Sequence, residues 1–111
     1  MPNTFTRKLS RGVGTTATEI GSYTVGSGTT TVVVGLSITN TTGSAITANV
    51  FIQDNTLANT SLVTNAPISS GSSLIVGGGD QKLVLIAGDK VFVQSSASSS
   101  LDAVMSIMEI T

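Results

Sequence analysis

The clearest alternation of apolar and polar positions lies in residues 81–96, QKLVLIAGDKVFVQSS. Apolar side chains recur at every second position on both sides of a central Gly88-Asp89: Leu83, Leu85, Ala87, Val91 and Val93. Alternation of this kind is typical of strands with one buried face. Two residues that tolerate positive φ are typical of the tight turn of a β-hairpin. The pattern therefore predicts two paired strands around Gly88-Asp89.

The same period recurs in residues 31–39 and 46–53, which a turn containing Gly43 separates, so we expect a second hairpin there. Shorter strands are expected within residues 14–25, 61–63, 74–76 and 103–110, and a hairpin loop at the glycine run of residues 77–80. No stretch has a helical period. Short strands separated by turn signals predict an antiparallel β-sandwich, jelly-roll or Ig-like, of about seven to nine strands. A small Greek-key barrel fits the same pattern.

The alternation also divides the apolar residues into two sets. One set is expected to form the core: Val32, Val34, Leu36, Ile38, Ile46, Val50, Ile52, Leu83, Leu85, Val91, Val93, Met105 and Ile107. The opposite parity carries a second set: Val33, Phe51, Val84, Ile86, Phe92, Val104, Met108 and Ile110. Burying one such side chain is worth roughly 1.5 to 3 kcal/mol, so we expect this second set to meet another subunit. Cover by a segment of the same chain is the alternative.

Residues 1–12 differ in composition from the rest, because Arg7, Lys8 and Arg11 are three of the five basic residues of the protein. We expect an extended N-terminal arm over residues 1–12, followed by a single sandwich domain over residues 13–111. Phe5 and Leu9 are the apolar points by which such an arm would dock on a neighbouring subunit. An edge strand of the same domain fits these residues equally well.

Composition narrows the possible partners. The 111 residues carry a net charge of −1, only 10% are charged, and 33 are Ser or Thr. This balance offers no field for nucleic acid or an anionic membrane, and no apolar run approaches the roughly 18 residues of a membrane span. Sparse charge with a mean hydropathy of +0.38 favours association with other protein. We expect a homo-oligomer or a subunit of a larger assembly.

The chain has few residues of the types that carry out catalysis. The chain contains no His, Cys or Trp, so a Ser or Thr nucleophile would have only Lys82, Lys90 or a carboxylate beside it. Gly77-Gly78-Gly79-Asp80 precedes a strand and not a helix, so it is not expected to bind phosphate. Neither imidazole nor thiolate is available for zinc or copper, and the four aspartates do not form a calcium loop. We therefore predict a protein that is not an enzyme and has no cofactor, metal or small-molecule substrate.

Several segments resemble small virion structural proteins of tailed bacteriophages, of the cyanophage and myophage type. The resemblance covers roughly residues 29–111 and is carried by these segments: 66–74, 78–85, 87–91 and 103–111. Residues 5–10 are also similar to those proteins. The resemblance implies a β-sandwich in the virion, assembled in the host cytoplasm, with the major capsid protein or other virion proteins as partners.

Within a virion, this resemblance and the second apolar set favour a decoration or cement protein that binds across capsid subunits. The alternative is a neck or tail component, such as a ring-forming adaptor, a terminator or a fibre-attachment subunit. Eight residues are the candidate interface: Phe5, Arg7, Leu9, Phe51, Ile86, Phe92, Met108 and Ile110.

Overall fold

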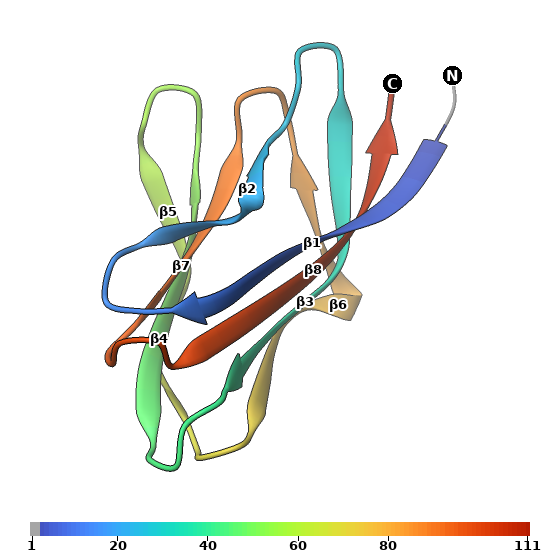
Figure 1. The fold of residues 1–111 in the computed structure, drawn as a ribbon. Coiled ribbons are helices and arrows are strands. Elements are labelled where there is room, and N and C mark those ends of the chain that lie inside the picture. The colour runs from blue at the N-terminus through green and yellow to red at the C-terminus, as the bar shows by residue number, and fades with distance from the viewer. Residues whose placement is uncertain (1–2) are drawn as a thin grey trace.

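The protein is a sandwich of two four-stranded antiparallel sheets (Figure 1). A computed structural model describes residues 3–111, and the side chains of residues 77–81 lie outside that description. The eight strands are β1 (Asn3–Val13), β2 (Thr18–Thr24), β3 (Thr30–Asn40), β4 (Ile46–Gln53), β5 (Asn59–Ile68), β6 (Ser73–Leu85), β7 (Lys90–Ser95) and β8 (Leu101–Ile110). The predicted all-β antiparallel sandwich is thus confirmed.

The order of the strands identifies the form of the sandwich. Sheet A has the order β1-β8-β3-β6, and sheet B has the order β2-β7-β4-β5. Successive strands therefore alternate between the sheets, and β4 and β5 are the one pair of consecutive strands that lie side by side. Eight strands crossing in this way make a jelly roll. Of the forms that the sequence left open, the structure has the jelly roll.

The core lies between the two sheets and draws on both. Leu36, Ile38 and Ile107 of sheet A and Val50 and Val93 of sheet B are at most 1% exposed. Each comes from a strand whose alternate residues are less buried, because successive side chains of a strand point to opposite faces. Burial of this inner parity supplies the main driving force for folding.

Both predicted hairpins are wrong, although their strands exist. β6 lies in sheet A and β7 in sheet B, and β3 and β4 are divided in the same way. Gly88 has a φ of 90°, and the Asp89 amide donates to the Ile86 carbonyl at 3.0 Å, so the turn itself is tight. It joins facing sheets, and Leu85 and Val91 on its two sides are both buried in one core. The alternation of apolar and polar residues shows which side of a strand is buried. It does not show which other strand pairs with it.

A bulge in β3 reverses part of the predicted core. The register between β3 and both of its neighbours shifts between Val33 and Gly35. Val33 is therefore fully buried, whereas Val32 and Val34, which were expected inside, point outward and are half-buried. An extra residue in one strand changes which parity faces inward. The rest of the predicted core set is buried or, for Ile52 and Leu83, packed against the core.

The N-terminal segment is an edge strand of the domain. β1 pairs with β8 from Asn3 opposite Ile110 to Val13 opposite Leu101, and Val13 is 3% exposed. The expected division between residues 12 and 13 therefore falls inside β1, and these residues do not form a separate arm in this structure. The expected loop at residues 77–80 is also wrong at the level of the backbone, which continues through them as part of β6.

The turn between β6 and β7 provides a test of this fold. A Cβ added at Gly88 would lie 2.5 Å from the Cβ of Asn55, and φ there is positive. Gly88→Ala should therefore lower the free energy of unfolding by more than the roughly 1 to 3 kcal/mol that backbone strain alone costs. Chemical denaturation measures this loss.

Two other glycines are matched controls. Gly28 has a φ of 76° with open space around it, and Gly43 has open space and no positive φ. Gly28→Ala should show the loss from backbone strain alone, and Gly43→Ala should be near neutral. Equal losses at residues 28 and 88 would contradict the close approach of the β4–β5 loop to this turn.

Candidate protein-interaction faces

The outer side of sheet A carries apolar residues across all four strands. Phe5 of β1 is opposite Met108 of β8, Met108 is opposite Val32 of β3, and Val32 is opposite Val84 of β6. Phe5 is 72% exposed and Val84 is 62% exposed. Directly opposed side chains of neighbouring strands are in contact range, so the four make one continuous row.

A second row crosses the same sheet further along the strands. It consists of Leu9, Val104, Ser37 and Ile75, again each opposite the next. Ile75 is 67% exposed. We call the outer side of sheet A face A, and its apolar members are Phe5, Leu9, Val32, Val34, Ile75, Val84, Ile86, Val104, Met108 and Ile110. An apolar surface that spans a whole sheet is typical of a protein-interaction site.

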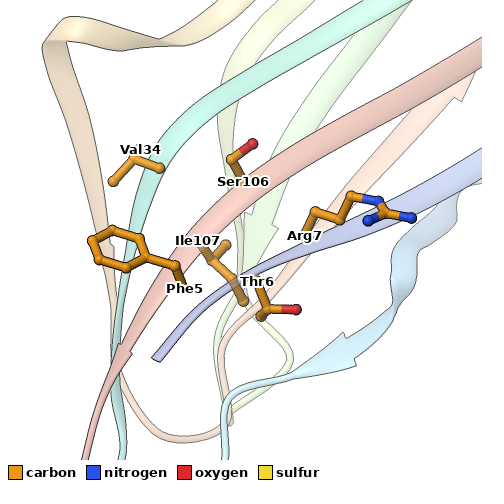
Figure 2. A pocket seen from close by; sticks show the side chains of 6 residues that line it. All are labelled: Phe5, Thr6, Arg7, Val34, Ser106 and Ile107. Carbon is orange, nitrogen blue, oxygen red and sulfur yellow. The ribbon is translucent and has the colours of Figure 1, made fainter. Parts of the chain in front are cut away.

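An open hollow of about 450 Å³ lies between these two rows. Phe5 and Arg7 from β1, Val34 from β3 and the small Ser106 from β8 line it (Figure 2). Arg7 is opposite Ser106, and among the described residues its guanidinium has no hydrogen-bond or ion-pair partner. The hollow thus combines an apolar wall with a free cation. The hydroxyls of Thr6 and Ser106 have no His or carboxylate beside them among the lining residues that could act as a general base.

The outer side of sheet B, which we call face B, has a different centre. Phe51 of β4 is opposite Phe92 of β7, and their rings stack with centroids 5.2 Å apart and planes 3° apart. Glu19 of β2 continues the row on the other side of Phe92. Its carboxylate accepts a hydrogen bond of 2.8 Å from the Thr24 hydroxyl. Face B therefore places a carboxylate beside an aromatic pair.

The eight candidate interface residues divide between these two faces. Six lie on face A and are brought together by pairing of β1, β8 and β3 and by the turn after β6: Phe5, Arg7, Leu9, Ile86, Met108 and Ile110. The other two, Phe51 and Phe92, lie on face B, on the far side of the core. The sequence treated them as one surface because it could not assign strands to sheets.

Further members of face A were missed as site residues. Val84 and Val104 belong to the outward parity that the sequence displays, so the signal was present. Val32 and Val34 were expected in the core, because no feature of the sequence indicates the bulge after Val33. Ile75 lies in a run of three apolar residues, where alternation gives no direction.

A buried polar cluster links the two sheets beside face A. The Tyr23 hydroxyl of β2 lies 2.7 Å from the Thr31 hydroxyl of β3 and donates to Glu109 of β8 at 2.8 Å. The Lys8 ammonium lies 5.0 Å from the centre of the Tyr23 ring. Desolvation by burial, together with the charge and hydrogen bond of Glu109, raises the pKa of Tyr23 above its ordinary value, although the Thr31 hydrogen bond opposes this. The protonated Tyr23 hydroxyl thus links β2 of sheet B to β3 and β8 of sheet A.

Residues 3–76 and 82–111 contain no group of three acidic, His or Cys side chains that could hold a metal ion. Asp54 accepts hydrogen bonds from Thr56 and Ala58 in the β4–β5 loop, which lower its pKa. It therefore shapes that loop. Within the described residues, no helix has the length and apolarity needed to cross a membrane.

Comparison with known proteins identifies the fold. No protein-family profile and no curated protein matches the chain. A solved structure of Bacillus endospore appendages, a family of disulfide-linked pili, has a TM-score of 0.58 at 14% identity, over 99% of this chain and 87% of that one.

Two chains from infectious bursal disease virus are also similar. The chain of the T13 viral particle has a TM-score of 0.56 at 10% identity, and that of the Gx strain has 0.54 at 8%. Each match covers 96% of this chain, which spans only 30% and 32% of those viral chains. At these identities the likeness shows a shared sandwich fold.

The hydroxyl of Tyr23 supports a prediction about pH. Tyr23→Phe removes the hydrogen bonds to Thr31 and Glu109 and should lower the free energy of unfolding at neutral pH by about 1 to 3 kcal/mol. Because the folded state raises the pKa of Tyr23, this group stabilises the protein fully below the unfolded value of about 10 and progressively less as pH rises through the folded value. The difference between wild type and variant, measured by denaturation, should narrow above about pH 10.

The direct control is spectroscopic. Tyr23 is the one tyrosine of the chain, so ultraviolet absorbance of the phenolate reports this residue alone. Titration of the folded protein at the ordinary pKa of about 10 would contradict the buried cluster.

Proposed function

We propose that this protein is a non-enzymatic structural subunit of a virion that acts by burying surface against other protein. The observation that supports this most is face A, where apolar side chains cross all four strands of sheet A. Monomeric proteins rarely leave a continuous apolar patch of several hundred Å² in water. Burial of these side chains by a partner would itself stabilise the complex, and no catalytic step is needed.

Two other observations support a role in a particle. The sequence resembles small virion proteins of tailed bacteriophages, and the jelly roll is the sandwich form shared with chains of the infectious bursal disease virus particle. The net charge of −1 gives the protein no overall positive field toward packaged DNA. These properties favour contact with protein over contact with nucleic acid.

Within the virion, we propose a decoration role, with face A bound to the major capsid protein across junctions of the shell. A standard interface buries about 1,600 Å², and its repetition over the shell would oppose separation of capsid subunits. Binding that stabilises only the assembled shell raises its apparent stability by mass action. The protein would then be localised to the outside of the head.

A ring or tube subunit in the neck or tail is the second candidate. One observation favours it: the match to the endospore pilus subunit extends over 87% of that chain, so a domain of this size and fold exists in a linear assembly. Without cysteine, this chain would have to assemble noncovalently. Faces A and B on opposite sides of the sandwich would then both be covered.

Copy number in purified phage particles tests the proposal. Quantitative mass spectrometry against the major capsid protein should give about one copy per capsid subunit, or one per few, because a decoration protein repeats with the shell lattice. Tail-only particles are the control, and they should lack the protein. About six or twelve copies per particle would contradict decoration and favour a neck or tail ring. Absence from particles would contradict a virion role.

A further inference from the structure

We propose that two copies of this chain pair through the edge strand β1, antiparallel about Phe5, so that sheet A continues from one copy into the other. The partner at this edge is thus a second copy of the chain. Such a contact goes beyond the proposed function, because it lies at the edge of sheet A and leaves face A open to a different protein. Three properties of β1 support it: its regular backbone, its exposure and its sequence.

Of the four edge strands in the described part of the chain, β1 has the longest regular edge (Figure 1). It pairs with β8 from Asn3 to Ser10 without a register shift. The other three edge strands, β2, β5 and β6, each have a register shift within their pairing, and β5 also contains Pro67 and a positive φ at Asn65. Bulges and proline are devices by which proteins prevent pairing at a sheet edge. Residues 3–10 of β1 contain neither, so their outward N–H and C=O groups are available to another strand.

The first part of β1 is also uncovered on both sides of the sheet. Residues 3–7 are all exposed. Thr6 is opposite the fully buried Ile107, so it lies on the inner side of sheet A, and its exposure shows that sheet B does not extend over it. Sheet B begins to cover β1 at Lys8, since a Cβ added at Gly21 of β2 would lie 2.5 Å from the Lys8 Cβ. A second strand can therefore approach residues 3–7 without meeting sheet B.

The sequence of residues 3–7, NTFTR, is compatible with antiparallel pairing to itself. With Phe5 opposite Phe5 of the second copy, Arg7 lies opposite Asn3. Thr4 then lies opposite Thr6, and opposed aromatic rings and opposed threonines both stabilise neighbouring strands. Parallel pairing in register would instead place the two Arg7 side chains together, which is unfavourable. The sequence therefore favours the antiparallel register about Phe5.

The contact is small and closes at two copies. Five residues at about 3.3 Å give a length of roughly 17 Å, and Phe5, which is 72% exposed, supplies the one large side chain from each copy. Stable complexes bury at least about 1,200 Å², so we expect a weak dimer in solution. Where both copies are bound to one shell, their high effective concentration would strengthen the pairing. The two faces A would then lie side by side on one continuous sheet of eight strands, four from each copy.

Cysteine crosslinking tests the pairing and its register, because the chain contains no cysteine of its own. Phe5→Cys, Thr4→Cys and Thr6→Cys are equilibrated in a glutathione buffer, where oxidised glutathione is reduced as the protein disulfide forms. Directly opposed residues have Cα atoms about 4.5 to 5.5 Å apart, which a disulfide can bridge. Phe5→Cys should therefore form a linked dimer by itself. An equal mixture of Thr4→Cys and Thr6→Cys should give about tenfold more linked dimer than either variant alone, because identical positions are then diagonal neighbours about 7 to 8 Å apart.

Leu9→Cys and Ser61→Cys are the matched controls. Leu9 is exposed on the same strand outside residues 3–7, and Ser61 is exposed on the bulged edge strand β5. Both should give only the low yield of random collision. Thermal melts establish that each variant is folded. The mixture of Thr4→Cys and Thr6→Cys keeps the Phe5 ring, so it decides the result if Phe5→Cys itself weakens the pairing.

Three results would overturn the proposal. Linked dimer from Thr4→Cys alone in the same yield as from the mixture indicates parallel pairing or no fixed register. Equal yields from Ser61→Cys and from the β1 variants indicate that β1 is not the preferred edge. Yields no higher than the controls from both Phe5→Cys and the mixture exclude pairing through β1, while copy number in particles still decides the virion role separately.

Discussion

The rest of the structure depends on one constraint: successive strands share a single core from opposite sheets. Every connection except that between β4 and β5 crosses from one sheet to the other. Two strands joined by a short turn, such as β6 and β7, therefore bury Leu85 and Val91 in the same core from opposite sheets. Their outward residues then emerge on opposite sides of the molecule, and this division creates faces A and B.

Connections that cross between the sheets bury polar groups, and nearby residues satisfy the hydrogen bonds of these groups. Asn40, at the end of β3, is fully buried, and its amide donates to the carbonyls of Ser44 at 2.7 Å and Ile68 at 3.0 Å. Its side-chain oxygen accepts from the Thr42 amide at 2.9 Å. Among the described residues, no buried side-chain nitrogen or oxygen lacks a partner. Small Ser, Thr and Asn side chains thus close the sandwich, and few charges remain to hydrate its outer faces.

The sequence predicted most of the strands, the all-β class and most of the core, because alternation directly reports burial. Leu36, Ile38 and Ile107 are inside as expected. It did not predict strand pairing, because a turn such as Gly88-Asp89 has the same composition whether it joins neighbours in one sheet or facing strands of two. The bulge after Val33 was equally hidden, since its cause is the register with β8 and β6. For the candidate site, the sequence could indicate outward apolar residues, but only the sheet order assigns Phe5 and Phe92 to different faces.

That assignment changes what the apolar residues can do. If all of them lay on one face, a single partner could cover them and association would stop at a pair. On a jelly roll they lie on both sides of the core, so covering one face leaves the other available for a further partner. Arg7 lines the hollow of face A, and Glu19 continues the aromatic row of face B, so the two faces present different chemistry to a partner.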